Sequence, residues 1–151
     1  MNAEFQECLK REKIKPFSAG PRLVAKEFRT ARTDLKAAQD TLRTGNAKWA
    51  TIQAYYAMFH AGRALLYAKG YRERSHYCLV VALRMLYQGT GGLAPHLIEA
   101  LQRGKSLREH ADYYGEFTSG TAQQLLLDAA QFLQASHRLT RTSPPLVKAK
   151  T

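Results

Sequence analysis

The stretch PRLVAKEFRTARTDLKAAQDTLRT, residues 21–44, decides the fold class. Its apolar side chains recur at steps of four and three: Val24, Phe28, Ala31, Leu35, Ala38 and Leu42. This spacing places them on one face of an α-helix. The helix is expected to end at the following TGN, because Gly45 can adopt the left-handed conformation that closes a helix. The stretch therefore predicts a long amphipathic helix over about residues 21–44.

Further helices are predicted along the rest of the chain. Residues 47–69 carry apolar side chains around most of the helix circumference, which indicates a central helix that ends at Gly70. Ser75 can cap a third helix. Pro95 suits the first turn of a short helix that Gly104 would interrupt. A last long helix is expected after Thr121, which can form a capping box with Gln124.

The predicted fold class is all-α, an up-and-down four-helix bundle with a short extra helix before the last long helix. Nothing in the chain alternates with the period of two that a strand requires, so no strand is expected. The bundle should span residues 19–139. Residues 1–18 are expected to be a flexible N-terminal extension. Residues 140–151, which include adjacent prolines, are expected to form a disordered tail.

Composition narrows the function classes. Lys and Arg outnumber Asp and Glu by 23 to 12, and the resulting formal charge of +11 attracts phosphates, so nucleic acid, a nucleotide or an acidic protein is a plausible partner. Cys8 and Cys78 form neither a disulfide framework nor a metal spacing, which favours a reducing cytosol. We therefore expect no metal and no cofactor. No stretch has the apolar length of a signal peptide or membrane span, so a cytoplasmic protein without a membrane partner is expected.

The stretch SLREHADYYGEF, residues 106–117, concentrates polar and aromatic side chains. Ser106 and Glu109 fit the S-x-x-E capping box, which predicts that a new helical turn begins at Leu107. His110 precedes Tyr113 by three residues, so an imidazole and a phenol can meet on one side of that helix and transfer a proton.

Two further phrases, YYAMFHAGRALLYAKGYRERSH at residues 55–76 and LREHADYYGEF at residues 107–117, are followed by a long apolar helix. In this order they resemble a HEPN domain of the small prokaryotic branch that is often encoded beside a minimal nucleotidyltransferase. The resemblance covers about residues 21–138. It implies a helical bundle, a homodimer, and in many members metal-independent RNA cleavage at the dimer cleft.

Active members of that family carry an arginine, then four to six residues, then a histidine. Counting from Arg108 puts Tyr113 where the histidine is expected. Arg103 and His110 fit with six residues between them, although Gly104 and the predicted Ser106 cap fall in that interval. Both an active nuclease and a degenerate family member therefore remain open. In the active case, His110 would move a proton and Arg103 or Arg108 would hold the phosphate.

Other positions complete the predictions. Tyr113 is an alternative nucleotidyl acceptor, as the resemblance implies. Arg72, Arg74 and His76 flank a helix start, where they could bind phosphate or a nucleotide, or simply be capping charges. Basic side chains on residues 22–43 form either a solvated helix face or an RNA track: Arg22, Lys26, Arg29, Lys36 and Arg43.

Arg63 lies on the apolar central helix, where it needs an acid, and the predicted partner is Asp112 across the bundle.

Three functions follow from these patterns. The first is a dimeric HEPN-like component of a nucleotidyltransferase/HEPN pair of the toxin–antitoxin type, which binds RNA or nucleotide. The second is an active metal-independent RNase toxin. The third is a small-nucleotide-binding module built on the loop at residues 72–76.

Overall fold

The computed structural model describes residues 2–89, 91–110 and 117–142. Within these residues the chain forms six helices and two short strands in the order α1 (Ala3–Lys10), β1 (Ile14–Pro16), α2 (Gly20–Arg43), α3 (Ala47–Ala68), β2 (Tyr71–Glu73), α4 (His76–Tyr87), α5 (Pro95–Glu109) and α6 (Ser119–Thr142). None of the described helices is long and apolar enough to cross a membrane.

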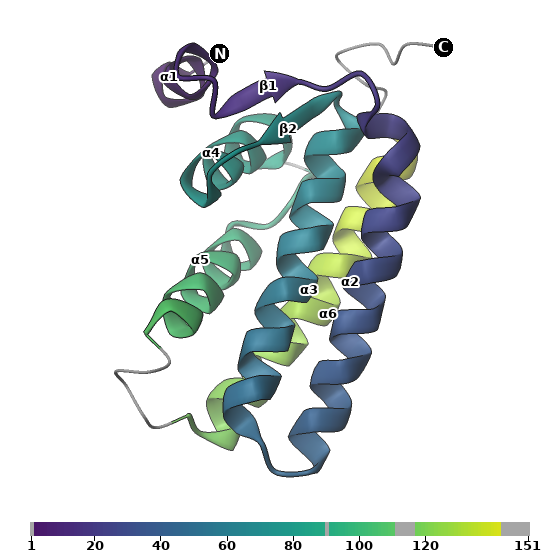
Figure 1. Ribbon diagram of the computed structural model, residues 1–151, viewed down its shortest axis with the longest axis vertical. Helices are drawn as coiled ribbons and strands as arrows, with labels where there is room; N and C mark the ends of the chain where they lie inside the picture. The colour runs from purple at the N-terminus through teal and green to yellow at the C-terminus, as the bar shows by residue number, and fades with distance from the viewer. Residues whose placement is uncertain (1, 90, 111–116, 143–151) are drawn as a thin grey trace.

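Three long helices, α2, α3 and α6, run side by side, and α4 and α5 lie along one side of them (Figure 1). The predicted helices over residues 21–44 and 47–69 are confirmed by α2 and α3 to within a residue at each end. Helix α3 is central, as its apolar circumference predicted, because fourteen of its 22 residues are buried. Ser75 caps α4 as expected, since its hydroxyl accepts the backbone N–H of Cys78.

The lengths of the shorter helices differ from the prediction. The expected third long helix, α4, has 12 residues, whereas the expected short extra helix, α5, has 15. The last helix begins before Thr121, and the Thr118 hydroxyl accepts the backbone N–H of Thr121, so the predicted capping box at Thr121 is wrong. The chain is a mostly helical bundle in which α5 packs against both α3 and α6.

A two-stranded antiparallel sheet crosses one end of the bundle, contrary to the all-α prediction (Figure 1). Strand β1 pairs with β2, so that Ile14 lies opposite Glu73 and Pro16 opposite Tyr71. Three residues are too few to display alternation in the sequence, which is why the pattern failed to predict them. The strands fasten the N-terminal segment to the loop that follows α3.

The N-terminal segment is folded onto the bundle rather than extended from it. Phe5 and Ile14 are buried, and the Phe5 ring meets the Tyr71 ring edge to face at 5.8 Å. Helix α1 begins at an Asn2 cap, whose side-chain oxygen accepts the Phe5 backbone N–H. Residues 2–18 therefore differ from the flexible extension that the sequence predicted.

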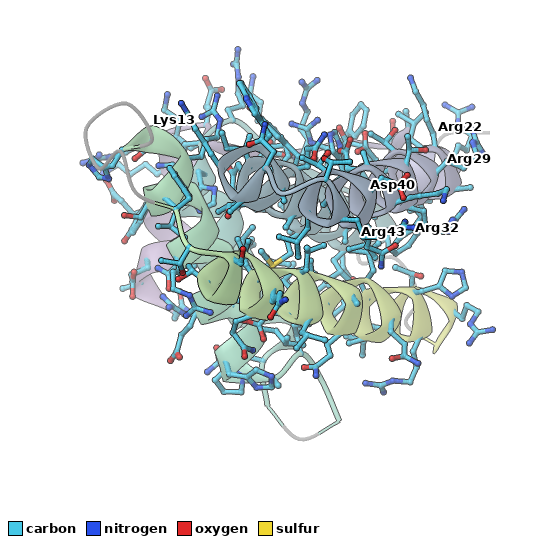
Figure 2. All side chains as sticks on the ribbon, turned by 90° about the horizontal axis from the view of Figure 1, so that it is seen from below. Lys13, Arg22, Arg29, Arg32, Asp40 and Arg43 are labelled. Atoms are coloured by element: carbon cyan, nitrogen blue, oxygen red, sulfur yellow. A yellow bond between two sulfur atoms is a disulfide. The ribbon has the colours of Figure 1, made fainter. Side chains whose placement is uncertain are left out.

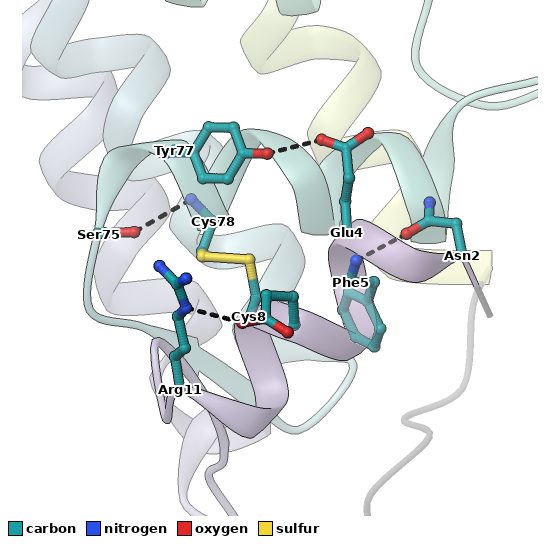
Figure 3. The surroundings of a disulfide bond; sticks show 9 residues. Asn2, Glu4, Phe5, Cys8, Arg11, Ser75, Tyr77 and Cys78 are labelled. Carbon is teal, nitrogen blue, oxygen red and sulfur yellow. Dashed lines mark hydrogen bonds and ion pairs between the residues drawn. A yellow bond between two sulfur atoms is a disulfide. The ribbon is translucent and has the colours of Figure 1, made fainter.

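A disulfide joins Cys8 of α1 to Cys78 of α4 (Figure 3). The expectation that these cysteines form no disulfide framework is wrong. Beside the bridge, the Tyr77 hydroxyl donates to the Glu4 carboxylate at 2.7 Å, again connecting α4 to α1. The two cysteines are 70 positions apart in the chain, and only the docking of α1 brings them together.

Candidate functional site

Helix α5 runs without interruption through Gly104 and Ser106, so the predicted break and the predicted capping box at residues 106–109 are both wrong. Gly104 is buried against α3, where an added Cβ would lie 3.2 Å from the Tyr55 Cβ. Its role is close packing rather than helix termination. Glu109 pairs with Lys105 at 3.0 Å one turn earlier, instead of reaching back to the Ser106 N–H.

His110 is the C-terminal cap of α5. Its backbone N–H donates to the Ser106 carbonyl at 3.1 Å, and its Nδ1 lies 2.8 Å from the same carbonyl. A carbonyl can only accept, so Nδ1 carries a proton in this contact. In the neutral ring the lone pair is then on Nε2, the atom that would take a proton from a substrate.

Arg103 is held at the junction of α5 and α6. Its Nη2 donates to the Asp128 carboxylate at 3.0 Å, and that carboxylate also accepts from the Gln124 side chain at 3.2 Å. Asp128 is almost completely buried, whereas the Arg103 side chain is 49% exposed. Because a guanidinium has five N–H donors, the bond to Asp128 tethers one of its nitrogens and leaves further donors on its exposed part.

The uninterrupted helix changes the relation between Arg103 and His110. They are seven positions apart, which on an α-helix is about 20° short of two turns and roughly 10 Å along the axis. They therefore project from nearly the same side of α5. Arg108 projects elsewhere: its guanidinium lies 5.3 Å from the centre of the Tyr56 ring on α3.

Two of the remaining candidate residues lie outside the described part of the chain. Tyr113 and Asp112 belong to residues 111–116, which lie outside the described residues. Arg63 has an acid in Glu73, to which it donates from Nε and Nη2, each at 3.0 Å. Glu73 is 8% exposed, and the Arg63 guanidinium also stacks 4.6 Å from the centre of the Phe59 ring. Within the described chain the acid partner of Arg63 is the buried Glu73, while the predicted pairing with Asp112 lies outside the described residues.

The three residues of the predicted phosphate loop do not converge. Arg72 stacks 5.2 Å from the centre of the Phe17 ring, which itself packs on Tyr67. His76 instead places its Nδ1 3.2 Å from the Tyr55 hydroxyl. Tyr55 and Tyr67 are twelve residues apart on α3, or about 18 Å.

Of the three groups, Arg72 and Arg74 are exposed cations, whereas His76 adds no positive charge. Arg74 is exposed, and only its backbone N–H is bonded, to the Lys13 carbonyl. Burial, followed by the nearby Lys105 ammonium, lowers the pKa of His76 to about 4. Burial likewise raises the pKa of Tyr55 to about 12. At neutral pH both side chains are uncharged, so His76 offers no cation to a phosphate.

Asp128 was missed, although the sequence carried a signal for it. It lies within the apolar stripe of the last helix, between Leu125 and Phe132, where an acid needs a cation. Arg103 is that cation. Among the described residues no group of histidine, cysteine and acidic side chains could hold a metal ion.

Comparisons with known proteins place these elements in a wider context. Residues 24–139 match the family model of the HEPN domain. A UPF0332 protein of Archaeoglobus fulgidus is 35% identical over 83 residues, which cover 54% of this chain and 66% of that protein. The crystal structure of TT1696 from Thermus thermophilus has a TM-score of 0.64 and 20% identity, over 77% of this chain and 97% of that one. That likeness concerns the fold.

Proposed function

Because the chain belongs to the HEPN domain family, we propose that it is the dimeric component of a nucleotidyltransferase/HEPN pair and binds RNA or nucleotide along α5. The observation that carries the proposal is the uninterrupted α5, on which Arg103 and His110 share one side. Arg103, tethered to Asp128 through one nitrogen, offers its remaining N–H groups to phosphate oxygens. The formal charge of +11 adds the long-range attraction that any polyanion would feel.

Metal-independent RNA cleavage is a second candidate, favoured by the contact between His110 Nδ1 and the Ser106 carbonyl. With the proton on Nδ1, Nε2 accepts the proton of the RNA 2′-hydroxyl, whose oxygen attacks the adjacent phosphorus. Arg103 stabilises the extra negative charge on the phosphate oxygens. The 5′-oxygen leaves with a proton from a protonated His110 of a second copy, giving a 2′,3′-cyclic phosphate. The dimer is therefore part of this proposal.

The test uses conservative variants, because removing Arg103 altogether would leave the buried Asp128 without its cation. Arg103→Lys keeps a cation beside Asp128 but loses the planar fork, and should weaken binding of a labelled single-stranded RNA about fivefold, the equivalent of ~1 kcal/mol. His110→Asn keeps a donor for the Ser106 carbonyl but lacks Nε2. Lys26→Ala, an exposed cation on α2, is the matched control and should change affinity little.

Cleavage is assayed on the same RNA in the presence of EDTA. If the second candidate holds, the wild type generates cyclic phosphate ends and His110→Asn loses at least about a hundredfold in rate. Binding without cleavage would leave the first proposal alone. Equal affinity of Arg103→Lys and wild type, with no cleavage by either, would refute both.

The expected assembly is tested independently of RNA. Light scattering at a salt level that screens the charge should give the mass of a dimer, and coexpression with a nucleotidyltransferase encoded beside this chain should yield a coeluting complex. A monomer across micromolar concentrations would contradict the dimer and, with it, the two-histidine cleavage scheme.

A further inference from the structure

A groove runs between α2 and α6, away from the α5 side chains described above. It consists of two adjoining hollows of about 780 and 490 Å³, which share Phe28, Arg32, His137 and Arg141. Both hollows are open to solvent, and their linings span residues 21–35 of α2 and 131–141 of α6. The groove is therefore a surface feature of the bundle rather than an internal cavity.

The floor of the groove is apolar. It is formed by side chains from α2 and α6 together with the first turns of α5: Val24, Phe28, Leu35, Leu97, Leu133 and Ala135. Val24 and Leu35 belong to the apolar stripe of α2, yet they are only partly buried by the rest of the bundle. The stripe is wider than the contact that α3 and α6 make with it. Phe28, Leu97 and Leu133 are buried, so the apolar area that a partner could still cover comes from Val24, Leu35 and Ala135.

The rim of the groove is basic. Arg29 and Arg32 stand on α2, and His137, Arg138 and Arg141 stand on α6, while neither hollow is lined by an aspartate or a glutamate. Figure 2 shows Arg22, Arg29 and Arg32 along α2, with Asp40 and Arg43 further along the same helix.

The acids of α2 are engaged elsewhere. Asp40 pairs with Lys36 and Arg43, and Glu27 contacts His60 of α3. Within the described part of the chain, the side chains of Arg29, Arg32 and Arg141 form no ion pair with an acid. Arg29, Arg32 and Arg141 thus keep their positive charge for an external partner.

The chemistry of floor and rim restricts the occupant. A second copy seated groove to groove about a two-fold axis would place its own rim arginines against these, and the like charges would repel. Stacking on exposed aromatic faces strengthens the binding of single-stranded nucleic acid in a groove, but Phe28 is 4% exposed and offers no such face. The most exposed large aromatic side chains, Trp49 and Tyr77, belong to α3 and α4 and do not line the groove.

We propose that the α2/α6 groove docks an acidic amphipathic helix of a partner protein. The apolar face of that helix covers the aliphatic floor, with anchors at spacings of three and four residues. Its flanking glutamates and aspartates face Arg29 and Arg32 on one side and Arg141 on the other. This inference does not depend on RNA binding along α5, because it uses different helices and different side chains.

The test uses the full chain and a labelled synthetic peptide of about 18 residues, with leucines on one helical face and glutamates elsewhere. Fluorescence anisotropy compares it with a scrambled peptide of the same composition and with a single-stranded RNA of similar charge. The double variant Arg32→Glu/Arg141→Glu should weaken the leucine-striped peptide at least about tenfold, as expected for two reversed rim charges. Lys26→Glu makes one such reversal outside the groove and should have little effect.

A floor variant separates the helix from RNA. Leu35→Gln should weaken the striped peptide severalfold while leaving RNA affinity unchanged, and Arg103→Lys should do the reverse. Equal binding of striped and scrambled peptides, or insensitivity of the striped peptide to Arg32→Glu/Arg141→Glu, would overturn the proposal. So would an RNA that displaces the striped peptide and loses the same affinity in the rim variant, since the groove would then be an RNA track.

Discussion

Opening the Cys8–Cys78 bridge is the perturbation with the largest expected effect on stability. The bridge closes a loop of 70 residues, and the chain-entropy model gives roughly 4 kcal/mol for a loop of that length at 25 °C. Both cysteines are buried, with 2% and 5% exposure, so the reduced thiols stay in apolar surroundings and gain little solvation in the folded state. Most of the loss should therefore come from the freer unfolded chain.

Urea denaturation of the untreated protein and of the protein reduced with a phosphine measures this loss. With a denaturant slope of about 2 kcal/mol/M, the midpoint should fall by about 2 M. The double variant Cys8→Ala/Cys78→Ala is the control, because it should match the reduced wild type and ignore the reductant. Once the bridge is opened, amide exchange should show that α1 unfolds before the long helices. Apart from the disulfide, only the small cluster around Phe5 and Ile14 and the Tyr77–Glu4 hydrogen bond hold this segment.

Two results would refute this reasoning. The first is alkylation of two free thiols in the untreated protein after unfolding without reductant. The second is a midpoint unchanged on reduction, when mass spectrometry confirms that both thiols have been freed. In the latter case α1 would be held entirely by Phe5, Ile14 and the Tyr77–Glu4 hydrogen bond.

Three further outcomes are expected. Ser106→Ala should leave the melting temperature unchanged or raise it slightly, by up to ~0.5 kcal/mol in stability, because Ser106 is an exposed position inside α5 and not a cap. Gly104→Ala should destabilise by up to ~2 kcal/mol in a urea titration, because the crowding of Tyr55 and Met58 by the new methyl group, at about 1–3 kcal/mol, outweighs the roughly 1 kcal/mol by which Ala is the better helix residue, and equal or higher stability would show that these two side chains give way. His76 is neutral when folded, with its pKa lowered to about 4 from the usual 6.5, so the unfolded chain binds the proton first and stability should fall as the pH drops from about 6.5 to 4. His76→Gln should flatten that part of the pH profile, and an identical slope in variant and wild type would contradict this assignment.

The long helices were predictable because periodicity over twenty residues averages out local exceptions. Helices α2 and α3 follow the apolar spacing closely, and the left-handed Gly45 and Gly70 stand where the sequence ends each helix. The short strands and the docking of α1 were not predictable, because they depend on contacts between Ile14 and Glu73 and between Cys8 and Cys78 that are distant in the chain. No local pattern encodes such pairings.

The error at residues 104–109 has a different origin, because local rules were applied correctly and tertiary packing overrode them. Gly104 is a poor helix residue in isolation, but its lack of a side chain allows α5 to approach Tyr55 closely. Ser106 and Glu109 satisfy the capping-box pattern, yet the helix continues through both residues. Glu109 pairs with Lys105 on that helix instead of capping a new one. The break that separated Arg103 from His110 in the sequence-based interpretation is therefore absent, and the spacing of the two side chains follows from helix geometry.

Helix α6 connects the two proposed surfaces. Asp128 on α6 pairs with Arg103 of α5, and about two and a half to three and a half turns later His137, Arg138 and Arg141 of the same helix form one rim of the groove. Because a body of charge +11 attracts any anion, RNA and an acidic helix should both lose affinity as salt rises. A salt titration alone would therefore not show which of the two surfaces binds RNA and which binds the acidic helix. If the two ligands bind at separate sites, Arg103→Lys should weaken RNA binding alone and Leu35→Gln should weaken peptide binding alone. The positive charge of the whole chain would still make both affinities depend on salt.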